Sequence, residues 1–141
     1  MTREQKDLLI NDLCGRLPYG VKCKVLELNE VQIQGSIQYD GENTLFDFWE
    51  DDQKIQYGYQ WYLSEFKPCL FPMSSMTEEQ KEELNKITDL DIDIAISNIK
   101  NDTPNYFTYR NRLNWLLKNH FDIYDLIPMG LAEDATGLNI Y

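Results

Sequence analysis

A period-two alternation of apolar and polar side chains between residues 21 and 62 constrains the fold more than any other feature of this sequence. The alternation is cleanest over residues 31–39, where valine and isoleucine occupy one face and glutamine and serine the other. This pattern is typical of a half-buried strand in an antiparallel sheet. We therefore expect Val31, Ile33 and Ile37 to point into a core.

Three further β-prone runs lie close by, at residues 21–28, 44–49 and 55–62. Short segments rich in acidic residues, Asn and Gly separate the later runs, and such segments favour tight turns. Short strands joined by tight turns indicate an antiparallel arrangement of sequence neighbours. The sequence thus predicts a four-stranded antiparallel meander or a small open β-barrel.

A helix is predicted before this β unit, over about residues 3–17. Thr2 and Gln5 form the pattern of a capping box, in which each side chain bonds the other residue's backbone N–H. Leucines then recur every four residues and give one apolar stripe, at Leu9, Leu13 and Leu17. Pro18 and Gly20 end the helix.

Helices are also predicted after the β unit, which makes the fold class α+β. Thr77 and Gln80 form a second capping box, which opens a short helix to about residue 86. Another helix is expected over residues 106–119, with leucines on its inner side.

Residues 64–76 are expected to connect the β unit to the helical unit. Pro68 and Pro72 argue against a regular element here, and Ser74-Ser75 favour a turn before the next helix. The segment therefore resembles a hinge. We expect a single domain, 1–141, made of a helix (1–20), a β unit (21–63), this proline-containing connector (64–76) and a mainly helical unit (77–141).

Residues 89–100 combine an apolar alternation with an acidic repeat. Ile92, Ile94 and neighbouring apolar residues alternate with aspartate, which favours a strand, although aspartate is a poor strand former. The D-x-D-x-D spacing at Asp89, Asp91 and Asp93 also opens calcium loops, which need a glycine at the sixth position and a glutamate at the twelfth. Those positions hold Ile94 and Lys100, so a calcium loop is excluded.

The charge of the chain bears on its partners. Its 141 residues carry 24 acidic and 13 basic side chains, a formal net charge of −11, and no long stretch is net basic. Proteins that neutralise phosphate backbones need a positive face. Nucleic acid is therefore not expected as a partner. The expected partner is a protein, and the acidic charge of the chain would favour one with a basic surface.

Location follows from what the sequence lacks. No apolar run approaches the roughly 18 residues of a membrane helix, and the first residues lack the apolar core of a secretion signal. Three widely spaced cysteines, Cys14, Cys23 and Cys69, favour buried thiols over a disulfide framework. We expect a cytoplasmic protein that does not bind membranes.

No pattern of catalytic, metal-binding or cofactor-binding residues stands out. Zinc and non-haem iron sites need clustered ligands, and His120 is the single histidine. Neither G-x-G-x-x-G nor a phosphate-binding loop occurs. A Cys–His pair assembled in space and a carboxylate-dependent site stay open as alternatives. The expectation is a protein without cofactor that is not an enzyme.

Two groups of residues are candidate interaction surfaces. Tyr57, Tyr59 and Trp61 fall on one face of a predicted strand, where they would stack nucleobases, grip a peptide or fill the core; the core is the favoured interpretation. Phe71, Met73 and Met76 could form an exposed apolar strip and support a homo-oligomer. The oligomeric state is left open.

Two segments resemble small uncharacterised proteins of gut Bacteroides-type genomes and their phages or mobile elements. They are the K-P-x-L-x-P-M-S-S-M-T-E-E run at residues 67–79 and the L-N-W-L-L-K-N-H-F-D run at 113–122, continued by L-I-P-M-G-L-A at 126–132. The family pattern K-P-Y-L-R-P has Cys69 and Phe71 here in place of its Tyr and Arg. The resemblance implies a prophage or mobile-element setting and no particular activity.

These observations favour a non-enzymatic protein-interaction or regulatory protein. The alternative is a small nucleic-acid-binding barrel that uses Tyr57, Tyr59 and Trp61. A carboxylate-dependent enzyme is the least favoured of the three.

Overall fold

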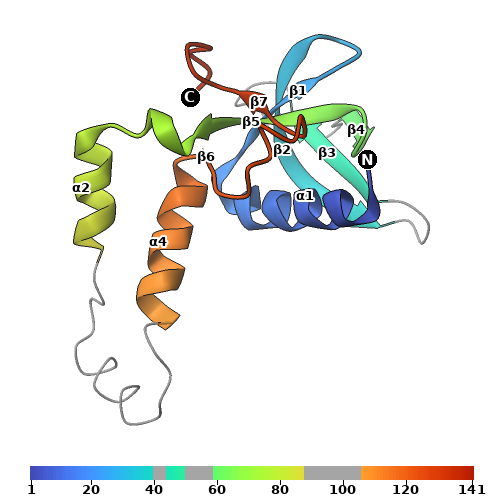
Figure 1. Ribbon diagram of the computed structural model, residues 1–141. Helices are drawn as coiled ribbons and strands as arrows, with labels where there is room; N and C mark the ends of the chain where they lie inside the picture. The colour runs from blue at the N-terminus through green and yellow to red at the C-terminus, as the bar shows by residue number, and fades with distance from the viewer. Residues whose placement is uncertain (40–43, 50–58, 88–105) are drawn as a thin grey trace.

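The computed structural model describes residues 1–39, 44–49, 59–87 and 106–141 (Figure 1). Helix α1 (Arg3–Arg16) lies across one face of a sheet, and helices α2 (Glu78–Lys86) and α4 (Tyr106–Lys118) stand side by side at one end of it. The fold is therefore α+β, with a helix before the sheet and helices after it, as the sequence predicts. The expected strand over residues 89–100 lies outside the described residues.

The described strands form one mixed sheet of seven, in the order β4-β3-β2-β1-β5-β6, with β7 also paired to β5. Neighbours from β4 to β5 are antiparallel, whereas β6 and β7 run parallel to β5. The predicted meander is thus present in β1–β4, but it is part of a larger sheet and not a closed barrel. The strands are β1 (Lys22–Val25), β2 (Glu30–Tyr39), β3 (Thr44–Trp49), β4 (Tyr59–Tyr62), β5 (Phe66–Pro72), β6 (Phe121–Asp122) and β7 (Glu133–Asp134).

The proline-containing connector is the main correction to the predicted fold, because residues 66–72 form β5, which lies between β1 and β6 in the sheet. Leu26 N–H donates to Glu65 C=O at 2.8 Å, so these two residues form a hydrogen-bonded pair. Paired and unpaired positions alternate along an antiparallel ladder, which places Pro68, opposite Cys23, at a position without a bond to β1. The missing N–H of Pro68 therefore costs no hydrogen bond to β1.

Strand β2 contradicts the predicted orientation over its first half. Gln32 and Gln34 are buried, at 1% and 2% exposure, whereas Val31 is 40% exposed. The register shifts between Gln34 and Ser36, as in a β-bulge, and beyond it Ile37 packs against the core as expected. A bulge inserts one residue and so reverses which face later residues take. The alternation alone does not reveal this.

Helix α1 covers the sheet with a stripe that is only half apolar. Its capping box is confirmed, since Thr2 and Gln5 exchange side-chain bonds to backbone N–H groups. The buried residues of the helix are Leu9, Leu13, Asp12 and Arg16. Leu17, predicted to extend the stripe, instead begins a short 3₁₀ turn (Leu17–Tyr19) and is only half-buried.

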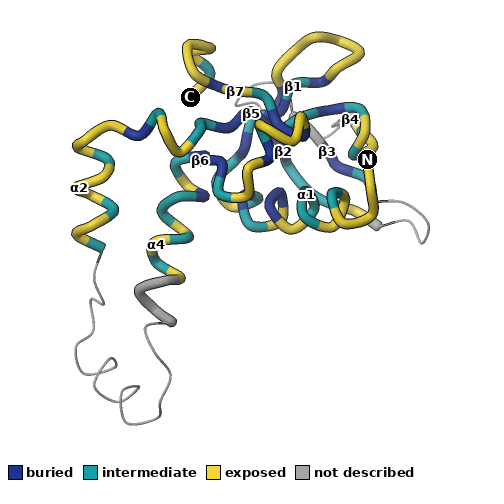
Figure 2. The backbone as a smooth tube through the Cα atoms, in the orientation of Figure 1, coloured by how far each residue is buried: buried dark blue, intermediate teal, exposed yellow. Residues whose placement is uncertain are grey.

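Burial is concentrated between α1 and the sheet (Figure 2). Phe46 and Phe66 meet there edge to face, with ring centroids 5.1 Å apart. By contrast α2, whose capping box at Thr77 and Gln80 is also confirmed, contains no buried residue. Among the described residues, no helix has the length and apolar character needed to cross a membrane.

Candidate functional site

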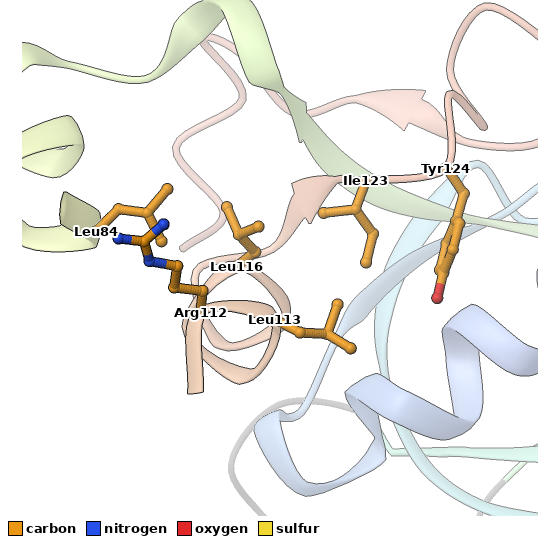
Figure 3. Close-up of a pocket in the computed structure, with 6 residues that line it drawn as sticks. All are labelled: Leu84, Arg112, Leu113, Leu116, Ile123 and Tyr124. Atoms are coloured by element: carbon orange, nitrogen blue, oxygen red, sulfur yellow. The ribbon is translucent and has the colours of Figure 1, made fainter. Parts of the chain in front are cut away.

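A groove lies between α2 and α4, and we refer to it below as the helix groove (Figure 3). Its cavity volume is about 260 Å³, below the range of roughly 300–1,000 Å³ common for drug-sized ligands. Of the described residues that line it, Arg112 is the only charged one. The lining residues are Leu84 of α2, Arg112, Leu113 and Leu116 of α4, and Ile123 and Tyr124 after β6.

Leucine spacing on α4 explains why one helix lines both the groove and the core. Leu113 and Leu116 are three residues apart, so they share a face of the helix. Leu117, four residues after Leu113, lies on the edge of this face that is turned toward α1 and is buried at 6% exposure, with its Cδ1 3.2 Å from the position that a Cβ at Gly15 of α1 would occupy. Gly15 therefore allows α4 to approach α1 closely, while Leu113 and Leu116 stay half-buried in the groove.

The second wall of the groove is α2. Leu84 is the one residue of α2 that lines the groove. The end of α2 is joined to α4 by a long hydrogen bond, in which Arg112 Nε donates to the Ile87 carbonyl at 3.4 Å. Beside this wall Leu113 and Leu116 of α4 stay half-buried, so their side chains are accessible.

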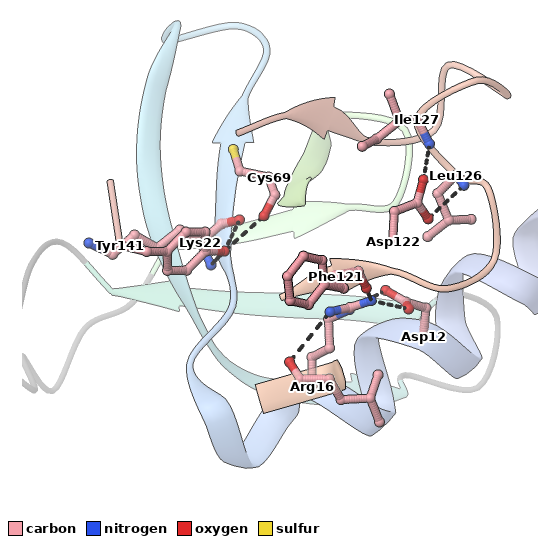
Figure 4. A network of polar contacts seen from close by, with 10 residues as sticks. Asp12, Arg16, Lys22, Cys69, Phe121, Asp122, Leu126, Ile127 and Tyr141 are labelled. Atoms are coloured by element: carbon pink, nitrogen blue, oxygen red, sulfur yellow. Dashed lines mark hydrogen bonds and ion pairs between the residues drawn. The ribbon is translucent and has the colours of Figure 1, made fainter. Parts of the chain in front are cut away.

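The other wall of the groove, α4, is fixed to α1 by the arginine of a buried ion pair within α1 (Figure 4). Arg16 Nε and Asp12 Oδ2 are 2.7 Å apart, and neither side chain is exposed. The same guanidinium donates to the carbonyl of Leu117 at 3.4 Å and of Phe121 at 2.7 Å. These carbonyls lie at and beyond the end of α4, where helix carbonyls lack partners within the helix. Arg16 thus caps α4 from α1.

The electrostatics of this pair reflect its burial. Burial raises the pKa of the Asp12 carboxyl, and the Arg16 guanidinium opposes that shift. A buried guanidinium with its hydrogen bonds satisfied is tolerated, whereas the same charge without its partner is costly. The pair therefore acts as a structural anchor for the wall of the groove.

Asp122 positions the last two groove residues. Its buried carboxylate accepts hydrogen bonds from the N–H groups of Leu126 at 2.9 Å and Ile127 at 2.8 Å (Figure 4). The segment after β6 is thereby held in a compact turn. Ile123 and Tyr124 lie within that turn and face the groove (Figure 3).

Tyr141 joins β1 to β5 on the side of the sheet away from α1. Its hydroxyl accepts a hydrogen bond from Lys22 N–H and donates one to Cys69 C=O, both at 2.9 Å (Figure 4). Burial raises the pKa of this hydroxyl. The hydroxyl thus continues the β1–β5 ladder just past the pair Cys23–Pro68.

His120 stacks on the ring of Tyr141, with centroids 3.9 Å apart. Burial, together with the positive charges of Arg16 and Lys22, lowers the pKa of His120 to about 4. Within the described part of the chain, no donor or acceptor reaches its buried Nδ1. The ring is therefore neutral at physiological pH and acts as an aromatic packing group.

The structure describes only part of the residues predicted as interaction surfaces. Tyr57 and the side chain of Tyr59 lie outside the described residues. Trp61 packs against the core, and its Nε1 donates to Gln32 Oε1 at 3.1 Å, in line with the favoured core interpretation. Met73 is 43% exposed.

The predicted apolar strip is wrong at Met76. This residue is buried, at 7% exposure, because the chain turns through a 3₁₀ helix (Met73–Ser75) immediately before it. Phe71 is half-buried and packs near Phe121 and Tyr141. Phe71 and Met73 therefore do not continue into a strip through Met76.

Sequence reasoning missed the helix groove. The spacing of the leucines of α4 predicts a single inner side for all of them. Their division between core and groove depends on which neighbours cover them. Among the described residues, no group of three or more His, Cys, Asp or Glu side chains is placed to hold a metal ion.

Comparisons of this chain with protein-family models, with curated proteins and with solved structures find no match.

Proposed function

We propose that this protein functions by binding a helical segment of a partner protein in the helix groove. The observation that carries the proposal is the apolar lining of the groove, to which α2 contributes only Leu84. Amphipathic helices commonly dock in such grooves through apolar residues spaced three and four apart. The cavity of about 260 Å³ suits a few apolar side chains of such a helix.

The charge of α2 specifies the flanking residues of the partner. Its exposed face carries four glutamates, of which two pair with lysines of the same helix. Such exposed pairs contribute little, so the acidic face stays attractive to cations. The occupant that fits is an apolar stripe flanked, on the side that meets α2, by Lys or Arg. The glutamates are Glu78, Glu79, Glu82 and Glu83.

This proposal keeps the non-enzymatic, regulatory role expected from the sequence. The prophage or mobile-element setting rests on the resemblance of the two sequence segments and is proposed on that ground alone. Of the three residues that the nucleic-acid alternative uses, the described one, Trp61, packs against the core, and its indole N–H bonds Gln32.

Affinity capture with matched variants tests the proposal. Leu113→Glu introduces a charge into the groove, and Leu26→Glu introduces the same charge at a 44% exposed leucine of the β1–β2 hairpin. Both variants are first checked for native circular dichroism. Proteins that the wild type and Leu26→Glu retain, but Leu113→Glu does not, are candidate partners.

The binding segment of a candidate is then synthesised as a peptide and titrated against each variant. We expect the peptide to form an amphipathic basic helix. Leu113→Glu should weaken the affinity for the peptide by about tenfold or more, as the loss of a central contact does. Binding should also weaken with salt. Equal binding to wild type and Leu113→Glu would refute the helix groove as the site.

A further inference from the structure

Three lysines gather on the face of the sheet opposite α1, and we call them the lysine cluster: Lys22, Lys24 and Lys67. In β1, Lys22 and Lys24 alternate with Cys23 and Val25, which are completely buried. Alternate residues of a strand point to opposite faces, so both lysines face away from the core. Lys67 of β5 lies directly opposite Lys24 in the ladder.

Like charges directly opposite each other destabilise a sheet, so the lysine cluster calls for an anion. Among the described residues, the only carboxylate paired with it is Glu133, whose Oε1 lies 3.4 Å from Lys67 Nζ. The nearby Glu65 carboxylate accepts the Tyr62 N–H at 2.7 Å instead. Within the described part of the chain, Lys22 and Lys24 form no ion pair, although the protein carries a net charge of −11.

The surroundings of the cluster restrict the kind of anion. Lys22 Nζ lies 5.9 Å from the centroid of the Tyr141 ring, and His120 stacks on that ring at 3.9 Å. Tyr141 is thus already engaged by a cation and a second ring, which leaves it unsuited to stack a nucleobase. The cluster offers cations without an aromatic platform, which suits a compact oxyanion.

We propose that the lysine cluster binds a phosphate group. Three lysines and Glu133 together leave a charge of about +2, and a phosphate monoester carries about −1.5 to −2 at pH 7. Lysine binds phosphate as a point charge, whereas arginine binds carboxylates and phosphates through two parallel hydrogen bonds. The cluster lies on β1 and β5, so this proposal is independent of the helix groove on α2 and α4.

The test is a titration of the ¹⁵N-labelled full chain with inorganic pyrophosphate, followed by amide chemical shifts. Sodium chloride at matched ionic strength controls for screening. Saturable shifts centred on residues 22–24 and 67, absent in chloride, are expected. Shifts that chloride reproduces would overturn the proposal, because the lysines would then only solvate the outer face of the sheet.

Matched variants and a second anion sharpen this test. Lys24→Gln should weaken the binding of pyrophosphate by about fivefold or more, because one of the three positive charges is lost. Lys86→Gln, on the exposed face of α2, should leave the affinity unchanged. Without the ligand, Lys24→Gln should unfold at no lower a temperature than wild type, because it relieves the repulsion with Lys67. Tighter binding of citrate than of pyrophosphate would overturn the phosphate assignment in favour of carboxylates.

Discussion

The body formed by α1 and the sheet buries its apolar side chains far more completely than the projection formed by α2 and α4. In the body, Leu13 and Phe46 have no exposed surface. In the projection, α2 contains no buried residue, and Leu84 is only half-buried in the helix groove. The same residue type thus fills a core in one region and lines an open groove in the other.

This difference teaches where stability and recognition reside. The body has a core closed on both sides, and in its buried ion pair the Arg16 guanidinium donates four hydrogen bonds to oxygen atoms. Apolar surface that no neighbour covers contributes little to folding and is available to a partner. We therefore expect substitutions in the body to change mainly the free energy of unfolding, and substitutions in the projection to change mainly partner binding.

The largest effect on stability is expected from Arg16→Met in the body. The substitution leaves the Asp12 carboxylate buried without its cation and removes the donor to the Leu117 and Phe121 carbonyls. We expect a loss of about 3–5 kcal/mol in the free energy of unfolding, measured by urea denaturation at pH 7.

Two variants control this measurement. Arg3→Met changes an exposed arginine of the same helix and should alter stability by less than about 0.5 kcal/mol. The double variant Asp12→Leu/Arg16→Met replaces both charges and should recover most of the loss. A loss below about 1 kcal/mol for Arg16→Met would contradict the anchoring role of the pair.

A paired truncation of leucines compares the two regions directly. Leu13→Ala should lower the free energy of unfolding by about 2–5 kcal/mol, because it leaves a cavity in the closed core. Leu84→Ala should cost less than about 1 kcal/mol, because its side chain is already half in contact with solvent. Equal costs in urea denaturation would show that the projection is packed as tightly as the body, and would remove the basis for the helix groove.

The third stability effect is the pH dependence contributed by His120. Its folded pKa of about 4 lies below the ordinary 6.5, so the unfolded chain takes up a proton first as the pH falls. This contribution is complete above pH 6.5, and up to about 3 kcal/mol is lost between pH 6.5 and 4. Asp12, whose folded pKa is raised, contributes in the opposite direction.

A substitution isolates the histidine from the carboxylates. His120 has a φ of 59°, a left-handed conformation that asparagine tolerates well, so His120→Asn removes the titration without backbone strain. The stability difference between wild type and His120→Asn should shrink or reverse from pH 6.5 to 5. A difference that stays constant over this range would show that His120 does not titrate below its ordinary pKa.

The candidate site was much less predictable than the fold. Trp61 could be assigned to the core because one face of a half-buried strand must be covered, and the structure agrees. Met76 could not be placed, since a short 3₁₀ turn decides which way it points. The distribution of charge along the chain does not reveal the lysine cluster, because Lys24 and Lys67 meet only through the pairing of β1 with β5.

The sequence by itself determined the features that depend on residues close together in the chain. Both capping boxes are confirmed, because Thr2 and Thr77 bond partners only three residues away. The β1–β4 meander is present because tight connections pair strands that follow one another.

Only the tertiary structure decided the features that need distant partners. Strand β5 is a strand because β1, more than 40 residues earlier, supplies its ladder. Arg16 is tolerated in the core because carbonyls 101 and 105 residues away accept its hydrogen bonds. Local patterns cannot encode such contacts, since the burial of a polar or proline residue is acceptable only when a partner from elsewhere in the chain satisfies it.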